Sequence, residues 1–351
     1  MRVRDCKRTS WPSVQRIRRS NALIIVGMML LNLFGLPFFQ RLFVHADHAV
    51  QTPQPTVIVI VGADGAEQYG AMFAEWADRW IAAATNAGHQ IVVIGRGEAA
   101  KDTDKQQLRA AIDDAKERSG VELWLVMIGH GTFDRREARF NLRGPDLSAQ
   151  ELSDWLKPVD RPIAIINSAS ASAPFVSALS FPKRVVIAAT KSGAEQNFAR
   201  FGDFLSQAIT DPTADLDKDD QTSLWEAFLK ASRRTAEFYS TDGRLQTEHA
   251  VLDDTGDGQV VRSDQFRGLT PLEVSPDGKA LDGQFTHQWH FVRNAVEAAL
   301  PPETLKQRNS LEFAILQLRE RKKTMESAEY FLQLERLLVE LAELNESVRA
   351  D

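Results

Sequence analysis

The sequence is poor in cysteine, and this absence excludes several classes of protein. Its one cysteine, Cys6, lies in a basic N-terminal segment. Residues 47–351 therefore form no disulfide and no thiolate metal site. The chain also has no Gly-x-Ser-x-Gly nucleophile elbow, no Gly-Lys-Ser/Thr phosphate loop and no repeat of solenoid period. A disulfide scaffold, a P-loop nucleotide site and a repeat array are all excluded on these grounds.

Basic residues dominate the N-terminus, whereas acidic residues outnumber them in the rest of the chain. Residues 1–46 carry eight Lys and Arg against one Asp, so the rest of the chain has a net charge of −13, compared with −6 for the whole. A body this acidic repels the phosphate backbone of nucleic acids. We therefore expect no nucleic-acid partner.

An apolar stretch, residues 22–39, follows the basic start of the chain. A basic segment before an apolar run is typical of a cleaved signal peptide, here residues 1–46, with a small residue, Ala46, at the end. It is equally typical of a transmembrane anchor held by cytoplasmic positive charge. Both alternatives remain open, and both place the main body outside the cytoplasm, in a periplasm or in the extracellular space. Residues 47–55 resemble a polar linker.

Short apolar runs alternate with helical patterns along the middle of the chain. The strand-like runs are 56–62, 90–95, 122–129, 162–167 and 184–190. Apolar residues three and four apart predict the buried faces of the first two helices, namely Tyr69, Phe73, Trp76 and Trp80, then Leu108, Ile112 and Ala115. Alternating strands and helices predict an α/β fold over residues 56–300, with a mostly parallel sheet covered on both faces.

Two of these strands end in residues of chemical interest. Residues 123–131 read LWLVMIGHG and residues 163–172 read IAIINSASAS. Because the carboxyl ends of parallel strands meet at one edge of a sheet, we expect His130-Gly131 to lie beside the Ser/Ala tract. Ser168, Ser170 and Ser172 would face one side if that tract is extended, whereas a small-residue turn under a helix is the alternative.

This layout resembles the legumain-like and caspase-like cysteine peptidases of clan CD, in which a His-Gly closes one strand and an Ala-Cys closes the next. The resemblance covers residues 56–238. Within this range, residues 56–62 resemble the family's first strand, and residues 188–193 resemble the strand that follows the nucleophile. It implies a caspase-like three-layer α/β/α sandwich. It also implies that the His130 imidazole polarises a substrate carbonyl or assists proton transfer, and that the Gly131 N–H contributes to an oxyanion hole.

The family's cysteine is missing from this pattern. One register places Ser170 at the nucleophile's position, and a register one residue earlier places Ala169 there. A serine hydroxyl needs an oriented base and usually a carboxylate behind that base. We therefore expect an inactive homologue that serves as a binding or scaffolding module for a peptide or protein ligand. The alternative is a peptidase or acyl hydrolase that uses Ser170 with His130.

An acidic segment follows the pattern of an EF-hand calcium loop. Positions one, three, five, seven, nine and twelve are occupied by Asp215, Asp217, Asp219, Gln221, Ser223 and Glu226. Alternating oxygen ligands suit Ca²⁺, although Asp220 stands at position six, where glycine normally makes the turn. The competing interpretation is that Ser223 and Glu226 form a capping box at the start of a helix. The predicted fold and function require no cofactor, and Ca²⁺ is the candidate ligand of this acidic loop.

A second loop repeats this pattern more weakly. Its candidate ligands are Asp253, Thr255, Asp257, Gln259 and Asp264. The loop follows a strand-like run rather than a helix, so a simple hairpin turn is the competing interpretation. His287 and His290 lie in a predicted helix and are interpreted as surface or packing residues.

Residues 301–351 form a separate helical segment in the sequence pattern. One apolar stripe consists of Leu311, Ile315 and Leu318, and another of Tyr330, Leu334, Leu337, Leu341 and Leu344. A charged break at 321–327 predicts a helical hairpin or coiled coil. The stripes could pack within the chain or mediate self-association through residues 302–351. A structural protein that assembles through these helices is therefore the third functional hypothesis.

Overall fold

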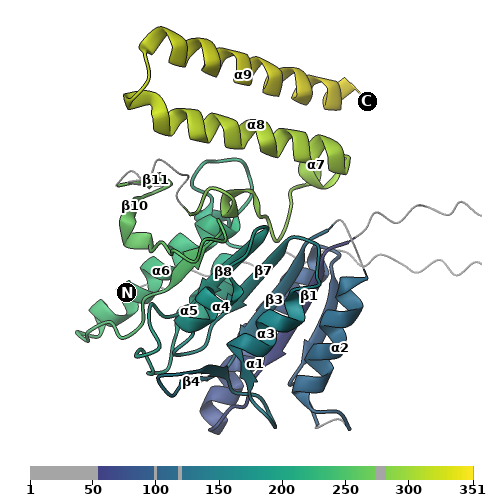
Figure 1. Cartoon of the computed structure of the whole chain (residues 1–351), viewed down its shortest axis with the longest axis vertical. Helices are drawn as coiled ribbons and strands as arrows, with labels where there is room; N and C mark the ends of the chain where they lie inside the picture. The colour runs from purple at the N-terminus through teal and green to yellow at the C-terminus, as the bar shows by residue number, and fades with distance from the viewer. Residues whose placement is uncertain (1–53, 99–100, 118–120, 273–281, 351) are drawn as a thin grey trace, which may run out of the picture. The chain divides into compact units, whose positions relative to one another are not determined.

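Six strands form the central sheet of the protein. The structure is a computed structural model that describes residues 54–98, 101–117, 121–272 and 282–350 (Figure 1). The strands lie in the order β2-β1-β3-β7-β8-β9, and every neighbouring pair is parallel except β8 and β9. Their bounds are Thr56–Val61 (β1), Gln90–Ile94 (β2), Leu123–Ile128 (β3), Ile163–Asn167 (β7), Arg184–Ala188 (β8) and Val251–Asp253 (β9). The predicted mostly parallel sheet is confirmed.

Helices cover both faces of the sheet and create two cores. On β1, Val57 and Val59 pack into a cluster with α1, α5 and α6, whereas Ile58 and Ile60 pack into a second cluster with α2, α3 and α4. Side chains of successive strand residues point to opposite faces, so a strand buried on both sides needs the unbroken apolar run that the sequence provides. The predicted three-layer arrangement is confirmed.

The helices begin where the sequence provides caps. Thr103 and Ser148 each accept the N–H of the third helical residue while a Gln or Glu reaches back, which closes capping boxes at α2 and α3. The bounds are Glu67–Asn86 (α1), Asp104–Lys116 (α2), Ala149–Leu156 (α3), Ala173–Leu179 (α4), Phe201–Ala208 (α5), Leu224–Thr241 (α6) and Ala295–Ala298 (α7). The predicted aromatic face of α1 and the Leu108 face of α2 are buried, with Tyr69 half-buried.

Small strands that the sequence patterns did not reveal occupy the loops. After β3, the strands β4 (Gly131–Phe133), β5 (Ala138–Phe140) and β6 (Leu147–Ser148) form an antiparallel sheet. A further pair, β10 (Phe266–Arg267) and β11 (Thr270–Pro271), lies after β9. Strands of two or three residues are too short to show a hydrophobic period.

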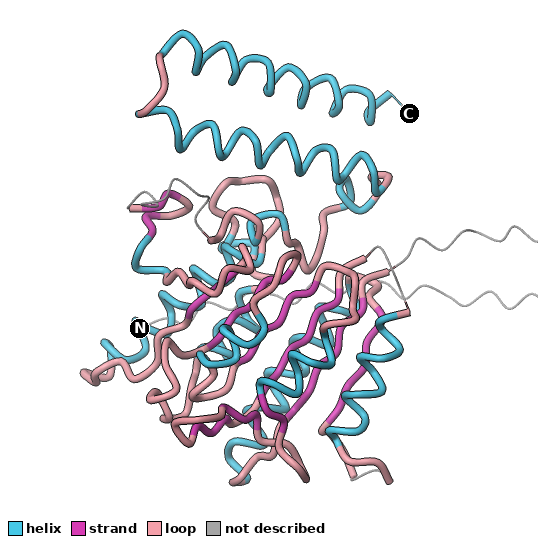
Figure 2. The backbone as a smooth tube through the Cα atoms, in the orientation of Figure 1, coloured by secondary structure: helices cyan, strands magenta, loops and turns pink. Residues whose placement is uncertain are grey.

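The C-terminal segment is a pair of helices, α8 (Pro302–Glu320) and α9 (Ser327–Ala350), which lie side by side (Figures 1 and 2). Ile315 and Leu318 of the first predicted stripe and Tyr330 of the second are buried. Within the described residues, no helix combines the length and apolar character needed to span a bilayer. The predicted signal or anchor at 1–46 and nearly all of the linker at 47–55 lie outside those residues.

Candidate functional site at the carboxyl edge of the sheet

The structure brings His130-Gly131 and Ser170 together, as the sequence predicts. Gly131 begins β4 directly beyond β3, and Ser170 follows the neighbouring strand β7. A Cβ atom on Gly131 would lie 2.3 Å from the backbone oxygen of Ser170 and 3.2 Å from the Ala169 Cβ. Only glycine allows the two strand ends to approach this closely.

Ser170 occupies the place predicted for a nucleophile, but its hydroxyl group is already bound. Ser170 Oγ donates a hydrogen bond to the Gly131 carbonyl oxygen at 3.1 Å and lies 3.4 Å from the Gly131 nitrogen. The side chain is only 5% exposed. Ala169, the alternative position, also lies beside Gly131 but belongs to the second core cluster, so Ser170 is the residue that brings a hydroxyl group to Gly131.

His130 is held by aromatic rings and by one backbone oxygen. Its Nε2 lies 3.2 Å from the Asp64 carbonyl oxygen, which can only accept, so Nε2 carries the proton. The ring packs edge-on against Tyr69 and Phe73, with centroid distances of 4.9 and 5.1 Å, and also contacts Phe198. No hydrogen bond joins His130 to Ser170 in the described structure.

The three serines of the tract do not share one side, which corrects the prediction for an extended segment. Ala171 has a positive φ of 52°, and the chain turns there into α4. Ser172 Oγ lies 3.2 Å from Thr190 Oγ1, while Ser168 packs close to Gly202. The small-residue turn under a helix is the arrangement observed, since small side chains allow the turn to be buried.

A loop after β8 covers the Ser170 end of the site. The Glu195 backbone oxygen accepts the N–H of Ala171 at 2.8 Å. The Glu195 carboxylate lies 2.6 Å from His249 Nδ1 and accepts the backbone N–H groups of His249 and Lys191. Sequence patterns did not reveal this carboxylate–imidazole pair, because its two members lie 54 residues apart.

A cavity of about 400 Å³ lies next to His130. Tyr69 and Phe198, which contact the imidazole, also line the cavity, together with Arg200 and Arg244. The Arg200 guanidinium stacks on Phe198 and Phe238. Arginine held against aromatic rings in this way is preorganised to bind a carboxylate.

Glu248 anchors the residues that carry this cavity. Its carboxylate, 1% exposed, accepts the backbone N–H groups of Arg200 and Phe201 at 2.8 to 3.0 Å, and the Tyr239 hydroxyl at 3.0 Å. The carboxylate therefore satisfies donors at the start of α5. Burial raises the pKa of Glu248, although these hydrogen bonds oppose the rise.

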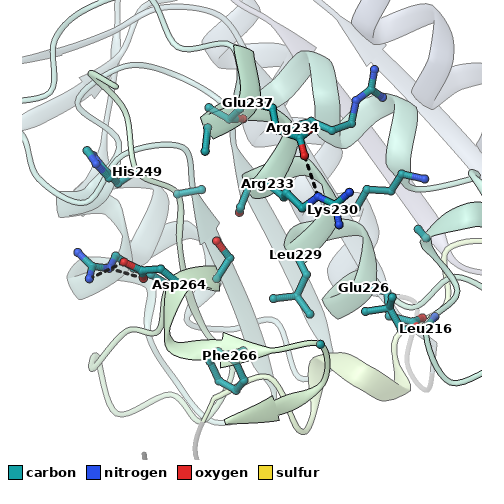
Figure 3. Close-up of a pocket in the computed structure, with 18 of the residues that line it drawn as sticks. Leu216, Glu226, Leu229, Lys230, Arg233, Arg234, Glu237, His249, Asp264 and Phe266 are labelled. Carbon is teal, nitrogen blue, oxygen red and sulfur yellow. Dashed lines mark hydrogen bonds and ion pairs between the residues drawn. The ribbon is translucent and has the colours of Figure 1, made fainter. Parts of the chain in front are cut away.

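A larger cavity, of about 650 Å³, lies along α6 (Figure 3). Lys230, Arg233 and Arg234 line it from the helix, and His249 and Asp264 from the loops opposite. Its charges are already matched in part, since Arg233 pairs with Glu237 at 2.9 Å. Four Lys and Arg side chains and three carboxylates line the cavity, so both signs of charge are present.

The Asp215 loop forms the capping box that the sequence offered as one interpretation. Ser223 accepts the N–H of Glu226, whose carboxylate accepts the Ser223 N–H at 2.9 Å and the Leu216 N–H at 2.6 Å. Asp220 has a φ of 65°, so it takes the left-handed turn normally made by glycine.

Asp215, Asp217 and Asp219 place carboxylate oxygens within 4.8 Å of one another. The remaining predicted ligands, Gln221 and Ser223, bind neighbours in the fold, Gln221 contacting Glu297 at 2.8 Å.

The helix predicted around His287 and His290 is wrong, but both residues are partly buried, in agreement with their interpretation as packing residues. Residues Thr286–Gln288 form a single 3-10 turn, and both side chains lie against the Asp215 loop. His287 Nε2 is 3.1 Å from Asp217 Oδ2, and His290 Nε2 is 3.8 Å from Asp219 Oδ2. Burial disfavours the charged imidazole, but the hydrogen bond to Asp217 and the negative charges of Asp217, Glu226 and Asp219 together outweigh it and raise the pKa of His287. Both imidazoles therefore contact carboxylates of the acidic loop.

The second acidic loop follows β9 and returns as a hairpin, because Leu252 and Val261 exchange backbone hydrogen bonds. Asp253 and Asp257 of this loop lie together, but the predicted Asp264 instead pairs with Arg262 at 3.0 Å. Predicted candidates Thr255 and Gln259 donate backbone N–H groups to Asp282 and Asp257. Asp282, from a distant turn, takes the place expected for Asp264.

Comparison with solved structures relates this chain to caspase-fold peptidases. The Drosophila initiator caspase Dronc matches with a TM-score of 0.41 and 14% identity over 62% of this chain and 89% of its own. Caspase-1 from Spodoptera frugiperda matches with a TM-score of 0.35 and 10% identity over 57% and 86%. A secreted C11 cysteine protease from Bacteroides thetaiotaomicron gives 0.34 and 11% over 61% and 67%. No protein-family model and no curated protein matches the sequence.

Proposed function

We propose that this protein is a caspase-fold peptidase homologue that binds a peptide or protein ligand without cleaving it. One observation carries the proposal: the hydroxyl of Ser170, at the nucleophile's position, is buried and donates to the Gly131 carbonyl oxygen rather than to His130. A serine becomes a nucleophile only when a base accepts its proton. Here that proton is engaged by the backbone.

The orientation of His130 supports the same conclusion. Its Nε2 proton is directed to the Asp64 carbonyl oxygen, and its ring is packed among Tyr69, Phe73 and Phe198. In serine hydrolases a carboxylate orients the imidazole and stabilises its charged form. Among the described residues, no carboxylate hydrogen-bonds to His130, so this support for proton transfer is missing.

The cavity beside His130 indicates the chemistry of the ligand. Arg200 and Arg244 line it together with the aromatic side chains of Tyr69 and Phe198. A guanidinium forms charge-assisted hydrogen bonds to a carboxylate, and aromatic rings provide apolar contact area. The proposed ligand is therefore a peptide segment that carries an acidic side chain.

Two measurements test this proposal on the full chain. The first is turnover of a diverse fluorogenic peptide library by the wild type, Ser170→Ala and His130→Ala; no cleavage above buffer is expected. Cleavage that disappears in both variants would instead establish the alternative, a peptidase or acyl hydrolase that uses Ser170 with His130. The second is binding of fluorescent peptides that differ only in Glu against Gln. Preference for Glu should be lost in Arg200→Ala and kept in the exposed control Arg233→Ala.

We further propose that the main body lies outside the cytoplasm, in a periplasm or extracellular space. Support comes from the sequence, in which a basic segment precedes the apolar residues 22–39. If the segment is uncleaved, the same residues attach the protein to a membrane. N-terminal sequencing of the mature protein from a membrane fraction and from a soluble fraction distinguishes cleavage after Ala46 from a retained anchor.

A second candidate function is assembly through α9. Outside the predicted stripe, α9 carries four exposed apolar residues: Phe331 at 56%, Leu332 at 68%, Leu338 at 48% and Val339 at 49% exposed. Apolar residues beyond a single stripe of a helix favour further helix packing, as in a bundle of four helices. Sedimentation of the full chain tests this, since Leu338→Glu should shift an assembled protein to monomer. Leu245→Glu, at an exposed leucine outside α8 and α9, is the matched control.

A further inference from the structure

Three aspartates from two distant segments converge beyond the end of β9. Asp253, Asp257 and Asp282 place carboxylate oxygens within 4.8 Å of one another. Asp253 is fully buried and Asp282 is 6% exposed, whereas Asp257 is exposed. The cluster therefore has a closed inner side and an open outer side, through which a small solute can enter.

Backbone groups orient these carboxylates without neutralising them. Asp253 accepts the N–H groups of Gly256 and Gly258 at 2.8 and 2.9 Å. Asp282 accepts those of Asp254 and Thr255 at 2.9 and 3.0 Å. Among the described residues, no basic side chain forms an ion pair with Asp253, Asp254 or Asp282. Grouping buried carboxylates without a counter-charge is costly, so the cluster needs either a bound cation or a shared proton.

A separate observation points to the same need. Asp254 is 5% exposed, and one of its oxygens, Oδ1, has no hydrogen-bond partner. The other, Oδ2, accepts from the Gly283 nitrogen at 3.0 Å and from the nitrogen and hydroxyl of Thr286 at 2.6 Å. The Asp254 carboxyl group also contacts that of Asp282. Buried polar atoms are nearly always satisfied, so the unpaired oxygen beside the cluster marks the place of an absent partner.

We propose that Asp253, Asp257 and Asp282 bind one calcium ion, with Asp254 beside it as a fourth carboxylate. All the donors are hard oxygen atoms, which Ca²⁺ prefers, and none is the imidazole or thiolate that favours zinc or copper. The site differs from the loop pattern in the sequence, because Asp282 replaces Asp264. It lies outside the His130 site and goes beyond the proposed peptide binding.

Such an ion would fasten two segments that are distant in sequence. Asp282 and Thr286 belong to the turn that leads to Phe291, and Phe291 is fully buried against Trp80 and Trp124. Asp253 ends an edge strand of the sheet. A ligand that binds only the folded arrangement stabilises it, so calcium should hold the 282–291 segment on the sheet.

Calorimetric titration of the full chain with calcium chloride, after removal of metal by a chelator, tests the proposal. Asp257→Asn is the informative variant, because Asp257 is exposed and the change preserves shape. Loss of one calcium equivalent is expected in Asp257→Asn and in Asp282→Asn. Asp264→Asn, an exposed neighbour outside the cluster, should bind as the wild type does. A thermal scan of each variant in chelator confirms folding before titration.

The other acidic loop provides an internal control for assigning the heat. Asp219→Asn removes a carboxylate from that loop and leaves the Asp253 cluster intact. Calcium uptake that is unchanged in Asp257→Asn, or that is lost only in Asp219→Asn, would overturn the proposal. An absence of calcium binding by the wild type would overturn it as well. A rise in melting temperature with calcium in the wild type and in Asp264→Asn, absent in Asp257→Asn, would support it independently.

Discussion

The hydroxyl of Ser170 donates a hydrogen bond to the carbonyl oxygen of Gly131 at 3.1 Å, and this bond joins the ends of two neighbouring strands. A residue for which the sequence predicted a nucleophile's position therefore contributes to the fold. The contact replaces the one that a serine hydrolase needs between its hydroxyl and its imidazole.

The first prediction is that Ser170→Ala lowers stability. A typical intramolecular hydrogen bond contributes about 1 kcal/mol, so the free energy of unfolding should fall by about that amount. Urea denaturation followed by tryptophan fluorescence measures it. Ser240→Ala, at an exposed serine near the end of α6, is the control and should leave the midpoint unchanged. Equal midpoints for wild type and Ser170→Ala would show that the bond contributes nothing.

The second prediction concerns the close approach at Gly131. A Cβ atom there would lie 2.3 Å from the Ser170 backbone oxygen, and a backbone atom cannot rotate away. Gly131→Ala should therefore cost more than about 2 kcal/mol or prevent folding, as overpacked buried sites do.

Gly88→Ala separates crowding from backbone strain. Gly88 has a φ of +71° but nothing within 4 Å of a built Cβ atom, so this variant should lose only about 1 kcal/mol. Thermal unfolding of both variants makes the comparison. A Gly131→Ala protein as stable as Gly88→Ala would contradict the tight contact.

The centre of the sheet could be predicted because β1, β3, β7 and β8 are buried on both faces. Burial on both faces demands an unbroken apolar run, and such runs at 123–128 and 163–167 are visible in the sequence. The edge strand β9 contributes only three residues, and β4 to β6 are no longer, so pairing decides them rather than pattern. The placement of His130-Gly131 and Ser170 at one edge of the sheet followed from the parallel direction of their strands.

The rest of the site depends on contacts between distant segments. Glu195 meets His249 across 54 residues, and Asp282 reaches Asp253 across 29. Loop spacing could identify Asp253 and Asp257, but it placed Asp264 where Asp282 lies, because no local pattern shows which turn will fold against β9. The acidic partners of His287 and His290 were missed for the same reason, since they belong to the Asp215 loop.

The third prediction concerns the pH dependence of stability. Burial opposes the charged form of Asp211, but hydrogen bonds from Lys230 and Thr213 outweigh it and lower the pKa of this carboxyl to about 2. A lowered pKa in the folded state means that the charged carboxylate stabilises the fold above the ordinary pKa. This stabilisation is lost as the pH falls toward 2.

Asp211→Asn should accordingly destabilise the protein by about 1 kcal/mol near neutral pH, a value reduced for solvent screening of the partly exposed pair. The difference from wild type should vanish as the pH approaches 2. Melting temperatures across the acid range measure both effects. Asp160→Asn, whose carboxylate is 91% exposed, should match the wild type throughout. A deficit independent of pH would contradict the ionic contribution.

The fourth prediction links Glu248 to ligand binding. Its two carboxylate oxygens accept the N–H groups of Arg200 and Phe201 and the Tyr239 hydroxyl. Both oxygens of the Glu248 side chain must therefore act as hydrogen-bond acceptors. In Glu248→Gln an amide NH₂ replaces one acceptor and faces a donor, which leaves buried donors unsatisfied and should cost about 1 to 3 kcal/mol. Because Arg200 lines the cavity beside His130, its backbone would shift, and affinity for an acidic peptide should fall together with the melting temperature.

Fluorescence anisotropy with a Glu-containing peptide, at a temperature where both proteins remain folded, separates the two effects. Glu237→Gln, an exposed glutamate on α6, should change neither quantity. Normal affinity in a destabilised Glu248→Gln protein would show that the Arg200 backbone is held by other contacts and that Glu248 serves stability alone.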